Sequence, residues 1–470
     1  MKKNIVIAAL LLILSGCRTI QENVDIHTGK NTETMEHTQS KTGSSRMPIA
    51  SAKDKTGYTL PKDYAEAYSY RNGRIDESIQ NIPQNIQITR TNNPDEYIRQ
   101  MSVYILKHSK NDFEKVKKAH DLVCTLVKYD ADNLWKNTVP DQNWKDTLVT
   151  GRAVCAGYAH LFKKICDEIK IHCEIVNGYG RGVGTSIFEG ETPAESNHAW
   201  NIVSVYNEHY LVDCTWDAGY MDGKISKQRY TTDWLFVKPE HFVYTHFPEN
   251  PSQQLLKKTI TAGEFITLPF LKPKYFELIE TAGAELKKIN HAAGKFILEY
   301  TVKDGYEITF TLYNKNSGKK HPEHSFTQFT GETYKTYFSF PEKGTYLITL
   351  FWKKTGEDTG RDCGEFGVIS SKGNTVVYPK HYSSSGKNIQ LISPIEMPLE
   401  KGRKYDFKIK IDNKNYAALI YNKKFIQLEK NPDGIFFKEL IIPEAANKMV
   451  IGIADTEIGR YEIVLEYSVK

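Results

Sequence analysis

The stretch from Asp146 to Asp217 constrains the fold of this chain more than any other. It begins with D-T-L-V-T-G-R-A-V-C-A-G-Y-A-H, continues to E-S-N-H-A-W-N-I-V-S-V-Y and ends with H-Y-L-V-D-C-T-W-D. Apolar residues recur at helical spacing after Ala153, whereas the two short apolar runs after His198 are typical of paired strands. We therefore expect a helix and then a β-hairpin in this stretch.

The predicted helix runs from about Ala153 to Ile169 and carries Cys155 in its first turn. Its apolar stripe consists of Val154, Tyr158, Leu161, Ile165 and Ile169. A strand is expected over Cys173–Tyr179, followed by a glycine-rich loop. The glycine spacing does not match G-x-G-x-x-G, so the loop gives no support for nucleotide binding.

Residues 198–214 are predicted to form the hairpin. A turn centred on Tyr206-Asn207 places Asp213 opposite Trp200, and His198 then becomes the diagonal neighbour of Asp213 on the same face, at ~7–8 Å between backbones. A turn shifted by one residue places Asp213 opposite Ile202 and separates the pair. A shared function for His198 and Asp213 therefore predicts the first register.

Cys155, His198 and Asp213 have the residue types and the order of a thiol-based acyl-transfer site. The first turn of a helix favours a thiolate through its unpaired N–H groups, and a nearby imidazolium favours it further. The histidine returns the proton to the leaving group, while the aspartate fixes the imidazole tautomer. The small neighbours Ala156 and Gly157 would leave room for a substrate chain. The N–H of Cys155 is a candidate oxyanion donor, and the sequence does not identify the second.

Each of these residues alone is compatible with a plainer role. A cysteine is most often a buried structural thiol, and a histidine at the end of a hairpin is most often at the surface. Asp213 is harder to account for in that way, because it interrupts an apolar strand. The three residues together, in order and in suitable local structures, are more specific than any one of them.

The other cysteines and histidines predict no metal site and no cofactor. There is no C-x-x-C, and Cys166, His172 and Cys173 lack the second half of a zinc site. Cys124, Cys166 and His120 lie on apolar helix faces, where we expect them to be buried. The histidines without a companion nucleophile are His160, His209, His241 and His246. The pairing of the cysteines stays open.

The N-terminus predicts export and a lipid anchor. Lys2 and Lys3 precede the apolar run Ile5–Leu14, which is too short to span a bilayer. The run ends in L-S-G-C, so residues 1–17 are similar to a bacterial lipoprotein signal peptide with its lipobox, which implies that Cys17 is lipidated and becomes the new N-terminus. Two or more acyl chains would hold the protein on a membrane. We expect a lipid-anchored protein of the bacterial cell envelope, facing either the periplasm or the exterior, with residues 18–60 as a flexible tether.

Helix-start signals and charge add two further expectations. Asn93-Pro94 and Asn111-Asp112 are predicted to begin helices, the second of which should end near Tyr129-Asp130, before a loop over 131–145. A net charge of +5, from 62 Lys and Arg against 57 Asp and Glu, is mild. It gives no support for nucleic-acid binding.

From about Ile260 the pattern changes to period-2 alternation, as in Y-D-F-K-I-K-I from Tyr405. Short strands with turn residues between them predict two β-sandwich modules, at 260–372 and 373–470, with a break near Ser371. The fold class is therefore α+β, with an α+β domain over 61–259 followed by two all-β modules.

The motifs G-R-A-V-C-A-G-Y-A, N-H-A-W-N and Y-L-V-D-C-T-W-D resemble those of the transglutaminase-like superfamily, and most closely its kyphoscoliosis-peptidase-like branch. The segments from Trp234 and from His246 also resemble the region C-terminal to the core in that branch. The resemblance covers roughly residues 93–260. It implies a papain-like α+β core, immunoglobulin-like modules, and a triad of Cys155 as nucleophile, His198 as base and Asp213 as orienting acid. Cys214 departs from the small residue expected after the aspartate and places a second thiol near the site.

These observations predict a membrane-anchored cysteine enzyme that cleaves peptide or amide bonds of a protein or peptide through a thioester. Protein-glutamine transglutamination is the first alternative, because it passes through the same thioester. The second is a catalytically silent surface scaffold that binds a protein partner through its β modules, which present loops. The sequence does not identify the substrate.

Overall fold

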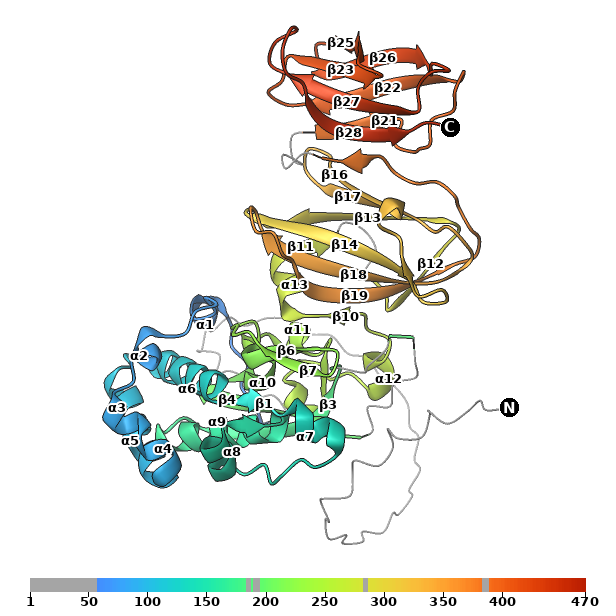
Figure 1. The fold of residues 1–470 in the computed structure, drawn as a ribbon. Coiled ribbons are helices and arrows are strands. Elements are labelled where there is room, and N and C mark those ends of the chain that lie inside the picture. Colours follow the sequence, from blue (N-terminus) through green and yellow to red (C-terminus); the bar gives the residue numbers. More distant parts are fainter. Residues whose placement is uncertain (1–56, 183–186, 189–194, 282–285, 383–388) are drawn as a thin grey trace, which may run out of the picture.

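The computed structural model describes residues 57–182, 187–188, 195–281, 286–382 and 389–470. They form a mixed α/β domain followed by two β-sandwiches, stacked one after the other (Figure 1). The predicted α+β fold class is thereby confirmed. In the described ranges no helix is both long and apolar enough to cross a membrane. The predicted signal, Cys17 and residues 18–56 of the predicted tether lie outside the described residues. The expectation that the tether extends to residue 60 is wrong, because Leu60 packs on the core of the domain and the carbonyl of Thr59 accepts from the N–H of His209 at 2.8 Å.

The α/β domain is built on one five-stranded sheet. Its order is β8-β5-β4-β3-β9, and each neighbouring pair is antiparallel. The strands are β3 (Cys173–Gly180), β4 (His198–Val205), β5 (Glu208–Val212), β8 (Leu235–Val237) and β9 (His246–Pro248). Side chains of β4 alternate between two cores: Val203 faces the helices, and Trp200 and Ile202 face the opposite side. Both faces of the sheet are thus covered.

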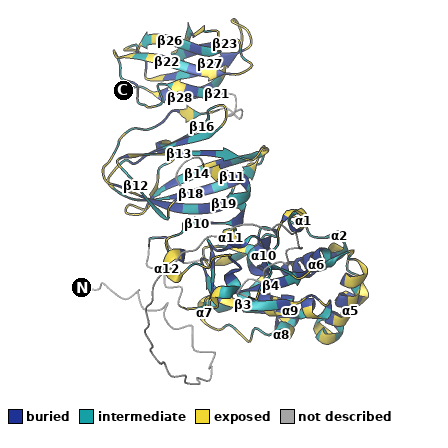
Figure 2. Ribbon diagram, turned by 180° about the vertical axis from the view of Figure 1, so that it is seen from behind, coloured by how far each residue is buried: buried dark blue, intermediate teal, exposed yellow. Residues whose placement is uncertain are grey.

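Helices cover one face of this sheet. The long ones are α5 (Pro94–Lys107), α6 (Asp112–Leu126) and α9 (Cys155–Glu168), and their inner sides are buried while their outer sides are exposed (Figure 2). The shorter helices before them are α1 (Ala65–Ser69), α2 (Glu77–Gln80), α3 (Gln84–Gln87) and α4 (Thr89–Asn92). Side chains that share this core include Met101, Val116 and Leu161.

The helix starts agree with the sequence, because local caps set them. The side chain of Asn93 accepts a hydrogen bond from the N–H of Glu96 at 3.2 Å, and Asn111 accepts from Glu114 at 2.9 Å. Both predicted starts are confirmed. The expected extension of α6 to Tyr129-Asp130 is wrong, since α6 ends at Leu126.

Tertiary pairing ends α6 early. Strand β1 (Lys128–Tyr129) runs parallel to β2 (Arg152–Ala153), and the N–H of Lys128 donates to the carbonyl of Gly151 at 2.9 Å. The loop expected over 131–145 is also wrong in part: it contains α7 (Ala131–Lys136), and α8 (Trp144–Thr150) begins within it. Asn143 caps α8 through the N–H of Asp146.

The β4–β5 hairpin has the predicted register. Asn201 pairs with Val212 and Val205 with Glu208, which leaves Tyr206 and Asn207 as the turn. Both turn residues have positive φ, at 51° and 64°. Two-residue hairpin turns favour this conformation, because its twist matches that of the strands. The register that brings His198 and Asp213 together is confirmed.

Two sandwiches follow the α/β domain. The first packs the sheet β10-β19-β18-β14-β15, with β12 also on β19, against β11-β13-β17-β16. Its strands are β10 (Phe270–Leu271), β11 (Ile279–Thr281), β12 (Ile289–Ala292), β13 (Lys295–Val302), β14 (Tyr306–Asn314), β15 (Lys319–Lys320), β16 (Ser325–Phe329), β17 (Tyr334–Ser339), β18 (Gly344–Lys354) and β19 (Arg361–Ser370).

The second sandwich packs β20-β28-β27-β23-β24 against β21-β22-β26-β25. Its strands are β20 (Lys380–His381), β21 (Ile389–Ser393), β22 (Lys404–Ile411), β23 (Tyr416–Tyr421), β24 (Lys424–Gln427), β25 (Glu429–Lys430), β26 (Ile435–Ile441), β27 (Lys448–Ala454) and β28 (Glu462–Ser468). The predicted alternation along β22 buries Phe407, Ile409 and Ile411. The exact limits of the three predicted domains remain predictions.

Arg181 ties the α/β domain to the first sandwich. Its side chain is buried beneath the connecting segment that holds α12 (Ala262–Phe265), just before α13 (Pro273–Leu278). The guanidinium donates to the carbonyls of Phe265 at 2.7 Å and Leu268 at 3.0 Å. These backbone contacts fix where the connecting segment leaves the domain.

Candidate active site

Cys155 is the first residue of α9, and its side chain is half-buried. Val154, just before it, is extended, and its N–H donates to the side chain of Gln142 at 2.8 Å. First-turn N–H groups have no carbonyl partner within their own helix. They therefore place partial positive charge beside the thiol.

Gly157, in the same turn of α9, does not leave room for a substrate. A Cβ atom there would lie 2.5 Å from both the Ala153 Cβ and the Thr147 Oγ1. The expectation that Gly157 opens space at the site is therefore wrong. Its lack of a side chain instead lets α9 approach β2 and α8 closely.

His198 begins β4 and lies between the other two residues. Its Nε2 is 2.8 Å from Oδ2 of Asp213, and its ring lies close enough to the thiol of Cys155 for the two groups to interact. Since Nε2 faces the carboxylate, Nδ1 is left for the thiol. Burial alone would lower the pKa of His198, but the charge of Asp213 and the hydrogen bonds to Asp213 and Cys155 raise this pKa to about 10.

Asp213 is fully buried and has four hydrogen-bond donors around it. Oδ1 accepts from the N–H groups of Thr215 at 2.8 Å and Trp216 at 3.2 Å, so the carboxylate caps α10 (Cys214–Ala218). Oδ2 accepts from His198 and from His246. Burial would raise the pKa of Asp213, but the charge of His198 and the hydrogen bonds from both histidines outweigh it and lower the pKa. The carboxylate therefore stays ionised.

The sequence did not single out His246, yet it contacts the candidate site. Its Nε2 lies 3.2 Å from Oδ2 of Asp213, and its Nδ1 lies 2.9 Å from the hydroxyl of Thr245. Burial and the charge of His198 lower the pKa of His246 to about 4, against the weaker opposing effect of Asp213. The ring is therefore neutral and donates its Nε2–H to the carboxylate.

Aromatic rings hold His246 in place. Its ring stacks on Phe242 at 3.9 Å between centroids and lies 4.4 Å from the ring of Trp216. Strand β9 enters beside β3, where His246 pairs with Gly180, and a Cβ atom on Gly180 would lie 3.0 Å from the His198 side chain. Only the strand order brings His246 there. The one signal in the sequence is its place in the segment that resembles the transglutaminase-like branch.

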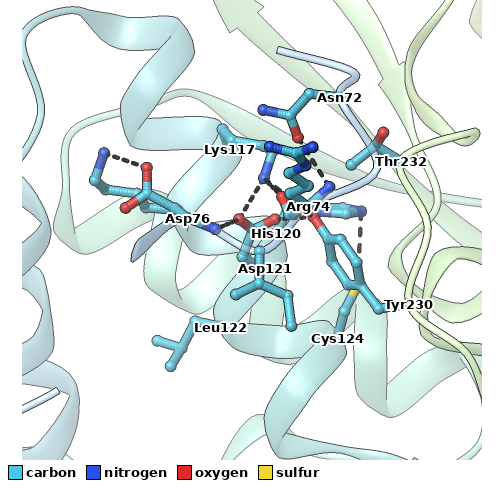
Figure 3. Close-up of polar contacts among 12 residues, drawn as sticks. Asn72, Arg74, Asp76, Lys117, His120, Asp121, Leu122, Cys124, Tyr230 and Thr232 are labelled. Carbon is cyan, nitrogen blue, oxygen red and sulfur yellow. Dashed lines mark hydrogen bonds and ion pairs between the residues drawn. The ribbon is translucent and has the colours of Figure 1, made fainter. Parts of the chain in front are cut away.

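A second buried polar cluster is centred on His120 of α6 (Figure 3), the helix that packs against α10. Its Nε2 is 3.0 Å from Asp217 and its Nδ1 is 3.1 Å from Asp121, which also accepts from Lys117 and Tyr230. The predicted burial of His120 is confirmed. Because Asp213 and Asp217 lie at the two ends of α10, this cluster holds the helix that Asp213 caps.

Cys214 was predicted to place a second thiol near the site. Its side chain is buried, and its backbone carbonyl accepts a hydrogen bond from the thiol of Cys124 at 3.3 Å. All six cysteines in the described part of the chain are free thiols, and five of them are buried. The expected burial of Cys124 and Cys166 is confirmed. Of those six, Cys155 is the most accessible to a substrate or a reagent.

The comparisons with known proteins agree with this geometry. Residues 99–216 match the model of the transglutaminase-like superfamily, and residues 263–379 match the KY-like, immunoglobulin-like domain. The chain is 27% identical to mouse kyphoscoliosis peptidase over 256 residues, which is 54% of this chain and 38% of that protein. It is 26% identical to the human protein over 314 residues, 64% of this chain and 46% of that protein.

A shorter match links the chain to hillarin of Drosophila melanogaster, at 30% identity over 131 residues, 25% of this chain and 16% of hillarin. The chain thus spans less than half the length of each of these relatives. A helix that starts with Cys155, a strand that starts with His198 and a capping Asp213 all lie within the first matched region. The chain therefore contains a transglutaminase-like domain followed by a KY-like, immunoglobulin-like domain, and it is homologous to kyphoscoliosis peptidase.

Proposed function

We propose that this chain is a cysteine acyl-transfer enzyme that hydrolyses peptide or amide bonds of a protein or peptide substrate. The observation that carries the proposal is the contact of His198 with Asp213, at 2.8 Å, beside the thiol of Cys155. This contact stabilises an imidazolium, and an imidazolium beside a thiol stabilises the thiolate. The superfamily match and the name of the peptidase relatives support the choice of reaction.

In the first step the Cys155 thiolate attacks the carbonyl carbon of the scissile bond. The resulting oxyanion lies near the N-terminus of α9, where the N–H of Cys155 is a donor. The intermediate collapses to a thioester, and His198 gives its proton to the departing amine. His198 is then neutral and able to act as a base.

In the second step a water molecule attacks the thioester. His198 takes a proton from the water, the carbon–sulfur bond breaks, and the carboxylic acid leaves with the thiolate–imidazolium pair restored. Asp213 remains ionised throughout and keeps the Nε2–H of His198 pointing toward itself. In a transglutaminase, an amine of a second substrate takes the place of this water.

The pH dependence of Cys155 alkylation by iodoacetamide tests the proposed nucleophile. We expect Cys155 to be labelled fast even at pH values well below the ordinary thiol pKa of ~8.5. In His198→Ala this fast labelling at low pH should be lost. Labelling of Cys155 with an ordinary thiol profile, unchanged in His198→Ala, would contradict an activated thiolate. The favoured function would then be that of a scaffold that binds a partner through its sandwiches.

Hydrolysis and transamidation are separated by their products. A casein digest is incubated with the enzyme and a labelled primary amine, with Cys155→Ala as the control. New peptide termini that depend on Cys155 support a peptidase, whereas Cys155-dependent incorporation of the amine without cleavage supports a transglutaminase. The proposal includes a lipid anchor at Cys17 in the bacterial envelope. Incorporation of labelled palmitate that is lost in Cys17→Ala tests this part separately.

A further inference from the structure

The first sandwich carries a second group of chemically active side chains, far from Cys155 in the sequence. His321, Glu323 and His324 surround the short 3-10 turn η2 (Pro322–His324), between β15 and β16. One ligand atom of each residue lies within 4.8 Å of the other two. The turn precedes β16, which lies on the side of the first sandwich that faces the second (Figure 1).

The backbone of this turn is fixed at three points. The N–H of His321 donates to the carbonyl of Leu312 on β14 at 2.9 Å, and the N–H of His324 donates to the carbonyl of His321 at 3.2 Å. The carbonyl of Glu323 accepts from the N–H of Tyr378 at 3.0 Å. The side chains therefore project from a rigid segment.

The distances between the ligand atoms are too long for hydrogen bonds. Oε1 of Glu323 lies 3.8 Å from Nδ1 of His321 and 3.6 Å from Nε2 of His324. Two ligands that bind one ion at ~2.0–2.2 Å, about 110–120° apart, lie roughly 3.3–3.8 Å from each other. The spacing fits a shared ion better than it fits direct pairing.

A hydrogen-bond chain sets the tautomer of His324. The hydroxyl of Ser339 donates its only proton to the carbonyl of Val376 at 2.6 Å. At 2.8 Å from His324 Nδ1, the same oxygen can then only accept, so Nδ1 carries the proton. Nε2 of the neutral ring is left with a free lone pair, and it faces the carboxylate of Glu323. A metal-binding histidine is commonly oriented by such a bond from its other nitrogen.

We propose that His321, Glu323 and His324 form a binding site for a first-row divalent transition-metal ion, for which Zn²⁺ is the probe. Two imidazoles and one carboxylate suit such ions, whereas Ca²⁺ and Mg²⁺ take oxygen ligands. The side chain of Glu323 is 49% exposed, so the ion enters from solvent and keeps water in its remaining positions. All three ligands come from the turn between β15 and β16, and His324 connects this turn through Ser339 to β17 and to the carbonyl of Val376.

The two histidines are not equivalent ligands. Nε2 of His321 is buried and has no hydrogen-bond partner within the described ranges. If Nδ1 binds the ion, the ring proton must lie on Nε2, where it is buried without a hydrogen-bond acceptor, and this costs free energy. We therefore expect a dissociation constant on the order of 10 µM rather than nanomolar binding.

The test is a calorimetric titration of Zn²⁺ into the full-length, chelator-treated chain. The parent protein carries Cys155→Ser, because the Cys155 thiol and His198 would also bind zinc. The parent therefore lacks the proposed nucleophile, so the result does not depend on the proposed enzymatic function. We expect one saturable site per chain that weakens at least tenfold in Glu323→Gln and in His321→Ala. The exposed position of Glu323 makes the first substitution mild for folding.

The matched control is His172→Ala. His172 lies 3.3 Å from Glu174 at the surface, so it offers the same residue types but no third ligand. This control should bind zinc as the parent does, and zinc should raise the melting temperature of the parent and the control but not of Glu323→Gln. Equal binding by Glu323→Gln and the parent, or no saturable binding below about 1 mM, would overturn the proposal.

Discussion

Asp213→Asn is the substitution that most directly tests the proposed chemistry. Asparagine keeps the oxygen that caps α10, so the bonds from Thr215 and Trp216 are retained. It replaces Oδ2 by an NH₂ group, which cannot accept the hydrogen bonds of His198 and His246. The substitution thus removes the negative charge and the shared acceptor of the two histidines but keeps the α10 cap.

The pKa of His198 gives the expected magnitude. It is raised from 6.5 to about 10, and each pKa unit corresponds to ~1.4 kcal/mol, so the imidazolium is stabilised by about 5 kcal/mol. Most of this comes from Asp213, with a part from Cys155. Without the charge, the pKa of His198 should fall back to or below 6.5, so the imidazolium should no longer predominate at pH 8.

The assay is the second-order rate constant of iodoacetamide labelling of Cys155 between pH 5 and 10. If the imidazolium of His198 stabilises the thiolate as proposed, the native chain should label fast at pH 6. Asp213→Asn should label slowly there and recover only near the ordinary thiol pKa of ~8.5. Melting temperature serves as the control for folding. Equal rates at pH 6 for the native and Asp213→Asn chains would refute the reasoning.

Three further predictions concern stability. Between pH 6.5 and about 4, His246 binds a proton in the unfolded chain but not in the folded chain. The free energy of unfolding should therefore fall by up to ~3 kcal/mol as the pH is lowered through this range. Urea unfolding at several pH values measures this fall, and His246→Phe should reduce it. A change from glycine to alanine stabilises an ordinary helix, but Gly157→Ala should destabilise this protein by roughly 1–3 kcal/mol, because the new Cβ would collide with Ala153. Thermal unfolding measures the change, and an increase in stability would contradict the packing. Asn111→Ala should cost about 1 kcal/mol through loss of the α6 cap, and Asn111→Ser should restore most of it.

Local chemistry accounts for the parts of the fold that the sequence predicted. The Asn93 and Asn111 caps start α5 and α6 where expected, because a cap is a contact between residues two or three positions apart. The hairpin register came from a two-residue turn at Tyr206-Asn207, which is also local. The change to period-2 alternation after residue 260 predicted the sandwiches, since each strand buries alternate side chains.

Within the candidate site, sequence order and residue type were enough to select Cys155, His198 and Asp213. A thiol at a helix start and two polar groups on adjacent strands form a combination that structural packing alone rarely requires. Their roles as catalytic residues remain predictions, although the structure brings His198 within 2.8 Å of Asp213 and beside Cys155.

The sequence by itself thus determined the α+β class, the helix starts, the hairpin register and three candidate residues, because each depends on side-chain period or on near neighbours. The tertiary structure alone decided the early end of α6, the tight packing at Gly157 and the contact of His246 with Asp213. These features arise from pairing between β1 and β2, from the approach of α9 to α8, and from the placement of β9 beside β3. Such contacts depend on how whole elements pack in space, and no periodicity or local cap in a single sequence records them.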